Sequence, residues 1–200
     1  MLKQESSLRK LQTSVGKTLA IIPLSPNHWT ILSLLVALIA GIMISFGELF
    51  LGLFLFAFAA LLDLVDGAVA RATGQVSKFG GFIDGVADRF VEAVFLFSFM
   101  FYPLPEIFID AKIWLASVLF LGTCMPSFVR AYADHKEVIA KSKALALGGI
   151  CERSERLLII IIGLFAGIIF SMDFFVYSLI IASFLSAITI LQRLFQISQK

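Results

Sequence analysis

Four aspartates, Asp63, Asp66, Asp84 and Asp88, lie at the ends of two strongly apolar segments of the chain. A carboxylate at a membrane boundary is costly, so four of them together need a chemical reason. If both segments are helices, Asp63 and Asp66 share one helix face, and Asp84 and Asp88 share another. A short link over residues 72–79 would bring the two pairs together. Converging carboxylates suit hard divalent cations such as Mg2+ or Mn2+, so the spacing predicts a metal site.

The composition indicates a membrane protein. Of the 200 residues, 60% are hydrophobic, which exceeds the apolar content of ordinary soluble domains. The length accommodates roughly six spans of about 20 residues each, with no room for a sizeable soluble domain. The apolar runs are too long for strands, so we predict an all-α integral membrane six-helix bundle. The two cysteines, Cys124 and Cys151, lack metal-ligand spacing and are expected to be unpaired thiols.

The chain divides into a short amphipathic segment and a domain of six spans. Leucines and a valine recur at helical spacing over residues 1–22, with Lys and Arg between them. This pattern predicts an N-terminal amphipathic helix on the membrane surface, with a solvated tail as the alternative. The six-span domain occupies residues 23–200, and its expected spans are residues 29–46, 49–73, 81–102, 113–133, 157–172 and 174–191.

The distribution of basic residues predicts the orientation of these spans. With six spans, every Lys and Arg except Lys112 falls on the side that carries both termini. Basic residues accumulate on the cytoplasmic side of membrane proteins. We therefore expect a multi-pass protein of the cell (plasma) membrane, with both termini and the four aspartates at the cytoplasmic face.

The aspartate motif resembles the signature of a known enzyme family. The pattern D-x2-D-G-x2-A-R-x8-G-x3-D-x3-D resembles that of the CDP-alcohol phosphotransferases, also called CDP-alcohol phosphatidyltransferases. All eight fixed residues of the pattern are present in this chain. The six-helix layout is also similar to that of the family. The resemblance implies transfer of the substituted phosphoryl group of a CDP-alcohol, often a CDP-lipid, to a hydroxyl group, with release of CMP. It also implies a homodimer.

The resemblance assigns a role to each residue of the motif. It implies that Asp63, Asp66 and Asp84 bind two Mg2+ or Mn2+ ions, and that Asp88 is the catalytic general base with a metal contact as well. An aspartate within hydrogen-bond reach can take the proton of an attacking hydroxyl. The CDP-alcohol would lie against Gly67, Ala70, Arg71 and Gly80. The glycines and the alanine leave room for close approach, and the arginine can hold a phosphate oxygen.

A second cluster is basic and comprises Arg130, Arg153, Arg156 and Arg193, all at predicted cytoplasmic helix ends. These arginines could anchor the protein to lipid headgroups or form ion pairs with neighbouring glutamates. They could also bind an acceptor that bears phosphate. The E-R-S-E-R-L stretch over residues 152–157 resembles the signature of phosphatidylinositol-phosphate and archaetidylinositol-phosphate synthases. That resemblance implies inositol 1-phosphate as the acceptor and the four arginines as its phosphate site.

Other functions stay open at this point. The acceptor could be glycerol phosphate, or the donor could be soluble CDP-inositol, as in di-inositol phosphate phosphate synthases. A divalent-cation carrier is the alternative of another class, because intramembrane carboxylates also line ion paths. The aspartates cluster at one membrane face and not at the midplane, which favours the enzyme. The sequence does not distinguish an acyl from an isoprenoid donor, and no nucleic-acid partner is expected.

Overall fold

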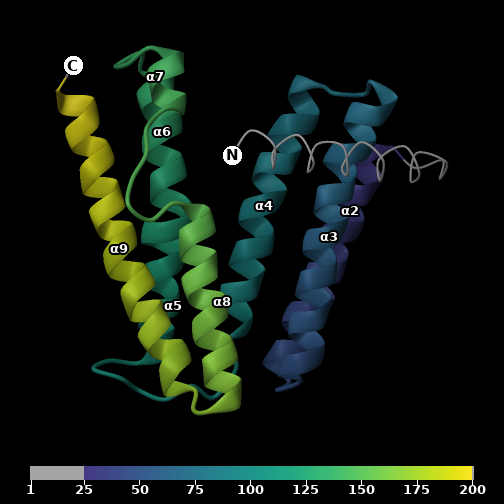
Figure 1. Cartoon of the computed structure of the whole chain (residues 1–200), viewed down its shortest axis with the longest axis vertical. Helices are drawn as coiled ribbons and strands as arrows, with labels where there is room; N and C mark the ends of the chain where they lie inside the picture. The colour runs from purple at the N-terminus through teal and green to yellow at the C-terminus, as the bar shows by residue number, and fades with distance from the viewer. Residues whose placement is uncertain (1–24, 200) are drawn as a thin grey trace, which may run out of the picture. The chain divides into compact units, whose positions relative to one another are not determined.

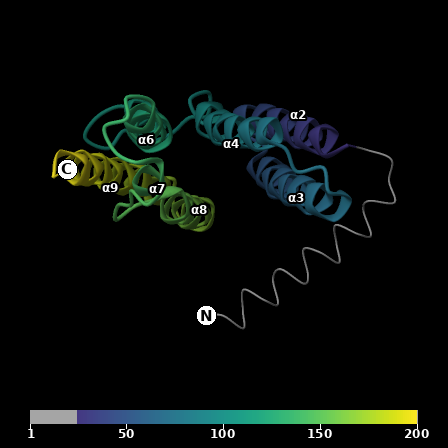
Figure 2. The same ribbon diagram turned by 90° about the horizontal axis from the view of Figure 1, so that it is seen from above.

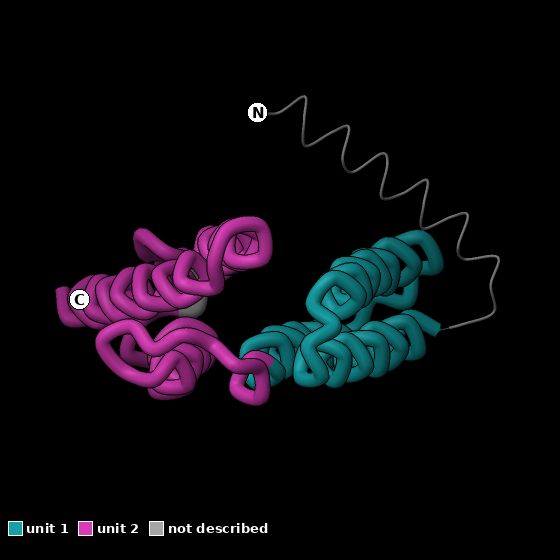
Figure 3. Tube along the Cα trace, turned by 90° about the horizontal axis from the view of Figure 1, so that it is seen from below, with its two compact units in different colours: residues 1–98 teal, residues 99–200 magenta. Residues whose placement is uncertain are grey.

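The structure, a computed structural model, describes residues 25–199. The segment predicted to form the amphipathic helix, residues 1–22, lies outside this part of the chain. In residues 25–199 the regular structure is helical, apart from one isolated bridge between Ile107 and Ile109. The chain separates into two compact units, residues 1–98 and residues 99–200, which are coloured separately in Figure 3. The prediction of an all-α protein is confirmed at this level.

The described part of unit 1 contains three long helices, α2 (Pro26–Ser45), α3 (Leu49–Thr73) and α4 (Lys78–Ser98) (Figure 1). Helix α2 packs against both α3 and α4, as the view from above also shows (Figure 2). Its buried face includes Ala37, Ala40 and Gly41. Small residues let neighbouring backbones approach closely, which is the usual basis of helix packing in membranes. Helix α2 therefore supports both helices that carry the aspartates.

The link between α3 and α4 is shorter than the sequence predicts. Helix α3 ends at Thr73, and Gly74 follows in the left-handed conformation with φ of 68°, which glycine adopts without steric cost. Helix α4 begins at Lys78 rather than at Gly81, because the Ser77 hydroxyl accepts a hydrogen bond from the Gly80 N–H at 2.9 Å. This short link places the two halves of the aspartate motif on consecutive helices, α3 and α4, which both pack against α2.

Unit 2 is built around α9 (Asp173–Ser198), which packs against α8 (Arg153–Ile169) and against a long composite helix. The composite helix consists of α5 (Ala111–Ser117), a π-helical segment η1 (Val118–Cys124) and α6 (Met125–His135). A short helix, α7 (Lys141–Leu145), lies between the fourth and fifth expected spans, residues 113–133 and 157–172. The π-helical segment is a second difference, because hydropathy cannot distinguish α from π windings.

Within residues 25–199, four helical segments are long and apolar enough to cross a membrane: Pro26–Ser45, Leu49–Thr73, Ala111–His135 and Asp173–Ser198. Long side chains such as Phe50, Phe54 and Phe195 are exposed on these segments. Apolar surface of this kind is stable in contact with lipid and costly in water. These helices support the prediction of a membrane protein.

Candidate active site

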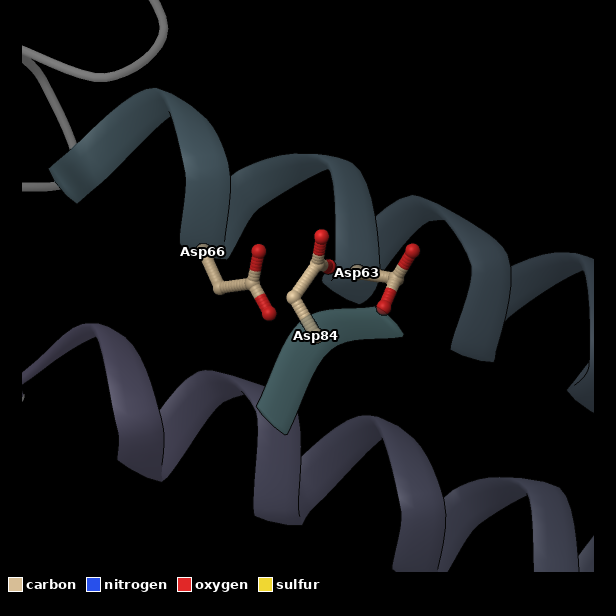
Figure 4. Close-up of side chains that lie close together, drawn as sticks. All are labelled: Asp63, Asp66 and Asp84. Atoms are coloured by element: carbon tan, nitrogen blue, oxygen red, sulfur yellow. The ribbon is translucent and has the colours of Figure 1, made fainter. Parts of the chain in front are cut away.

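Three aspartates of the motif converge between α3 and α4. One carboxylate oxygen from each of Asp63, Asp66 and Asp84 lies within 4.8 Å of the others (Figure 4). Asp66 is buried at 5% exposure, Asp63 is half-buried and Asp84 is exposed. Oxygen donors at these separations can share one hard cation, and partial burial keeps the carboxylates from being fully hydrated. The arrangement fits a divalent metal ion.

Asp88 lies one helical turn beyond Asp84 on α4 and is half-buried. Its Oδ2 atom is 3.6 Å from the Nη1 atom of Arg89, which also donates to the Gly85 carbonyl at 3.0 Å. This residue is outside the group of three whose oxygens converge. The position is consistent with a carboxylate that lies beside the metal site. The general-base role of Asp88 stays a prediction.

A cavity of about 260 Å³ opens next to the three converging aspartates. Asp66 and Asp84 line this cavity. So do the four residues predicted to bind the CDP-alcohol, which are Gly67, Ala70, Arg71 and Gly80. A side chain at Gly67 would place its Cβ 3.2 Å from the Arg71 Nη1 atom, so glycine leaves space for the guanidinium. The cavity therefore combines carboxylates for a metal with a guanidinium for a phosphate.

Helix α2 contributes a wall of the cavity that the sequence did not indicate. Pro26, Asn27 and Thr30 line it, and the Thr30 hydroxyl donates a hydrogen bond to Asp66 Oδ2 at 2.5 Å. Thr30 and Asp66 are 36 residues apart, so no local pattern connects them. A Pro at the first position of a helix is ordinary, and a Thr in the second turn of an apolar helix carries no functional signal by itself.

The four arginines predicted to bind the acceptor all belong to unit 2. Arg156 on α8 is 3% exposed, and Arg130 on α6 and Arg153 on α8 are half-buried. A Cβ added at Gly122 would lie 2.6 Å from Arg156 Cδ, so the π-helical segment lets this arginine pack against the composite helix. A buried guanidinium is costly to desolvate and needs a structural or functional reason.

Arg193 on α9 is 1% exposed and has two defined partners. Its Nη1 donates to the Pro126 carbonyl at 2.6 Å, and its Nη2 donates to Glu152 Oε2 at 2.5 Å. The sequence left open that arginines pair with nearby glutamates, whereas the structure pairs Arg193 with a glutamate 41 residues away in the chain. The role of Arg193 in binding phosphate stays a prediction, and any such contact would use its remaining N–H groups.

One face of α9 holds the segment that leads into α8. The Cys151 N–H donates to Thr189 Oγ1 at 3.0 Å, and the Ile150 N–H donates to Gln192 Oε1 at 2.9 Å. One turn further along, Gln196 Nε2 donates to the Gly148 carbonyl at 3.2 Å. Backbone groups outside a helix are satisfied here by side chains. These bonds, with the Arg193–Glu152 pair, fix the N-terminal end of α8 and thereby its arginines.

Comparison with known proteins identifies relatives of this chain. The model of the CDP-alcohol phosphatidyltransferase family matches residues 23–193. An archaetidylinositol phosphate synthase of Pyrococcus horikoshii is 37% identical over 186 residues, which cover 93% of this chain and 90% of that protein. A bifunctional IPC transferase and DIPP synthase of Aquifex aeolicus is 31% identical over 77% of this chain, but only 35% of that longer protein is covered.

Solved structures share the fold. The phosphatidylinositol phosphate synthase of Mycobacterium tuberculosis with CDP-DAG bound has a TM-score of 0.78 and 24% identity, with 94% of each chain covered. The same protein in complex with manganese and citrate also has a TM-score of 0.78, at 23% identity, covering 94% of this chain and 88% of that one. From the family match over most of its length and the complete aspartate motif, we conclude that this chain belongs to the CDP-alcohol phosphatidyltransferase family and is a membrane-bound CDP-alcohol phosphotransferase.

Proposed function

We propose that this enzyme transfers the substituted phosphoryl group of a CDP-lipid to the hydroxyl of inositol 1-phosphate and releases CMP. The observation that carries the proposal is the convergence of Asp63, Asp66 and Asp84 beside the cavity that Arg71 lines. Family membership favours this transfer over the alternative of a divalent-cation carrier.

The residues of the motif account for the steps of the transfer. The three converging aspartates, with Asp88, would hold two Mg2+ or Mn2+ ions, which neutralise a diphosphate and stabilise the attacking and leaving oxygens. Arg71 holds a phosphate oxygen of the donor by charge-assisted hydrogen bonds. Gly67, Ala70 and Gly80 leave room for the nucleotide. Asp88 accepts the proton of the attacking hydroxyl, and the bond to the CMP oxygen breaks as the new ester bond forms.

The acceptor is proposed from the arginines of unit 2. Arg153 and Arg156 begin α8, where the free N–H groups and the dipole of a long helix favour an anion. Arg193 lies on α9, which packs against α8, and Arg130 lies on α6, which packs against α9. The name of the Pyrococcus relative also includes inositol phosphate. A site of this charge favours an alcohol that bears phosphate over an uncharged alcohol.

We propose that the donor is a CDP-lipid that carries either acyl or isoprenoid chains. The Pyrococcus relative is an archaetidylinositol phosphate synthase, whereas the Mycobacterium structure contains CDP-DAG. Apolar helix surfaces accept either isoprenoid or acyl chains, because burial of hydrocarbon is not directional. An assay with both CDP-lipids therefore belongs in any test of the proposal.

A second candidate function has support from one relative. The bifunctional protein of Aquifex aeolicus includes a DIPP synthase, and it matches 77% of this chain. In this alternative the aspartate site is unchanged, but the donor is soluble CDP-inositol. Glycerol phosphate as the acceptor is a further variant of the same chemistry.

The membrane arrangement is also a proposal. We propose six spans: the four long apolar segments together with α4 and α8. With this count, all Lys and Arg residues except Lys112 fall on the side of the termini, which we assign to the cytoplasmic face of the plasma membrane. Residues 1–22 would form a surface helix and residues 23–200 the catalytic domain. Membrane lipids would surround the protein, and the resemblance to the family supports a homodimer.

An acceptor screen tests the proposed function. The purified protein is incubated with a CDP-lipid and Mg2+ or Mn2+, and CMP release is followed with inositol 1-phosphate, free inositol and glycerol phosphate. Both an acyl and an isoprenoid CDP-lipid are used, and CDP-inositol replaces them in a separate arm. The proposal expects inositol 1-phosphate to be the preferred acceptor. Preference for glycerol phosphate, or activity only with CDP-inositol, would contradict it.

A further inference from the structure

Thr30 connects α2 to the metal site through one buried hydrogen bond. Its hydroxyl donates to Asp66 Oδ2, and both residues are buried, at 4% and 5% exposure. A hydroxyl has a single proton to donate. The Pro26 carbonyl is the other acceptor within reach, at 3.3 Å against 2.5 Å for the carboxylate. The charged and nearer acceptor takes the proton, so Thr30 serves Asp66 rather than its own helix.

The hydrogen bond changes what Asp66 can offer to a cation. Asp66 Oδ2 accepts the bond from Thr30, and Oδ1 is the carboxylate oxygen that this bond does not engage. A carboxylate held at one oxygen cannot rotate freely, so the direction of the other oxygen is set before a cation arrives. Groups that hydrogen-bond to metal ligands orient those ligands and tune the affinity for the ion.

The surroundings of Thr30 are rigid enough for this purpose. Trp29, the preceding residue, forms a buried cluster with Leu62 and Val69 of α3. These two residues lie about one turn before and one turn after Asp66 on the same helix. The Ser33 hydroxyl donates to the Thr30 carbonyl at 2.9 Å within α2. The position of Thr30 relative to Asp66 is therefore fixed by packing on both sides of the hydrogen bond.

We propose that Thr30 is a positioning residue of the metal site, which holds the Asp66 carboxylate in the orientation that binds the divalent cation. The proposal rests on the function given above, because it takes Asp66 as a metal ligand. It assigns to α2 a chemical role in addition to its packing between α3 and α4. The mechanism is indirect, since Thr30 acts on the cation through its hydrogen bond to Asp66.

The test is Mn2+ binding to the purified full-length protein without substrates, measured by the loss of the electron paramagnetic resonance signal of free Mn2+. Thr30→Val keeps the shape of the side chain and removes the hydroxyl. We expect it to weaken Mn2+ binding ~10- to 100-fold, the usual effect of losing a partner of a metal ligand. Thr30→Ser restores the donor and should recover most of the affinity. Thr73→Val is the matched control, because the Thr73 hydroxyl donates only to the Val69 carbonyl of its own helix.

The outcomes separate this inference from the proposed function. If the wild-type protein binds Mn2+ and Thr30→Val binds it equally well, the positioning role is wrong and the proposed function stands. If the wild-type protein does not bind Mn2+ and does not release CMP, the proposed function itself fails. Should Thr30→Val not fold, Thr30→Ala and Thr30→Ser are compared instead. Equal Mn2+ affinities of these two variants would overturn the proposal, and an advantage for serine would support it.

Discussion

The guanidinium of Arg193 and the carboxylate of Glu152 form an ion pair that joins α9 to the start of α8, across 41 residues of sequence. Arg193 is almost fully buried, whereas the Glu152 side chain is 34% exposed. A buried guanidinium that loses its counter-charge keeps its desolvation cost without compensation. The pair therefore stabilises unit 2 and fixes the end of α8 that carries Arg153 and Arg156.

The Glu152→Gln variant tests this relationship. We expect the free energy of unfolding to fall by about 1.5–3 kcal/mol, the range for hydrogen bonds to charged groups. Denaturant or thermal unfolding in a mild detergent measures the change. Glu155→Gln is the control, because Glu155 is exposed on the same helix turn. Equal stabilities of the two variants would show that the pair contributes nothing to the fold.

The Gly122→Ala variant tests the placement of Arg156 without removing its charge. The new Cβ would lie 2.6 Å from Arg156 Cδ and 3.1 Å from Ser186 Oγ, so the buried arginine must shift. If Arg156 binds the acceptor phosphate, the KM for the acceptor should rise while the KM for the donor changes little. Gly148→Ala is the control, since nothing lies within 4 Å of a Cβ at that glycine.

The Arg156→Ala variant should act in the same direction and more strongly. Loss of one charged, hydrogen-bonded contact costs about 1.5–3 kcal/mol, which is roughly 10- to 150-fold in affinity for the acceptor. Arg156→Lys should recover only part, because an ammonium cannot reproduce the planar fork of a guanidinium. Unchanged KM values together with poor stability would instead make Arg156 a structural residue.

The Asp88→Asn variant tests the general base. The change keeps the size of the side chain and removes its ability to accept a proton, so turnover should fall at least about 100-fold. Binding of the CDP-lipid should largely persist. The substitution would also weaken the pair with Arg89, so Arg89→Gln is the control for that contact. Near-normal turnover of Asp88→Asn would reassign the proton to another acceptor.

Removal of metal should abolish activity and lower stability together. Carboxylates that converge repel one another at neutral pH without a cation. EDTA should stop CMP release, and Mg2+ or Mn2+ should restore it. Because the cation binds only the folded protein, a concentration of 100 times Kd should stabilise it by about 2.7 kcal/mol. Full activity in the chelator would contradict a metal mechanism.

The sequence predicted those features that depend on residues close together in the chain. The bounds predicted for α3, Leu49–Thr73, are those of the structure, because its apolar run ends at a glycine that breaks the helix. The four residues predicted to bind the CDP-alcohol all line one cavity, since their spacing along α3 and α4 determines the faces on which they lie.

Contacts between distant segments could not be predicted in this way. The Thr30–Asp66 and Arg193–Glu152 hydrogen bonds join residues 36 and 41 positions apart, and a single sequence contains no record of such pairings. The π-helical segment at Val118–Cys124 was missed for another reason: its residues are as apolar as those of an α-helix. The sequence predicted that the third span ends at Tyr102, whereas α4 ends at Ser98, because the apolar run continues beyond the end of the helix.

The most direct test of the central claim follows the acceptor itself. Radiolabelled inositol 1-phosphate is added to the purified protein with a CDP-lipid and Mn2+, and the lipid fraction is extracted and counted while CMP is quantified. We predict that label enters the lipid fraction in equal molar amount to the CMP released, and that the formation of both products falls at least about 100-fold in Asp88→Asn. CMP release without label in the lipid, or labelled lipid without CMP, would contradict the proposed transfer.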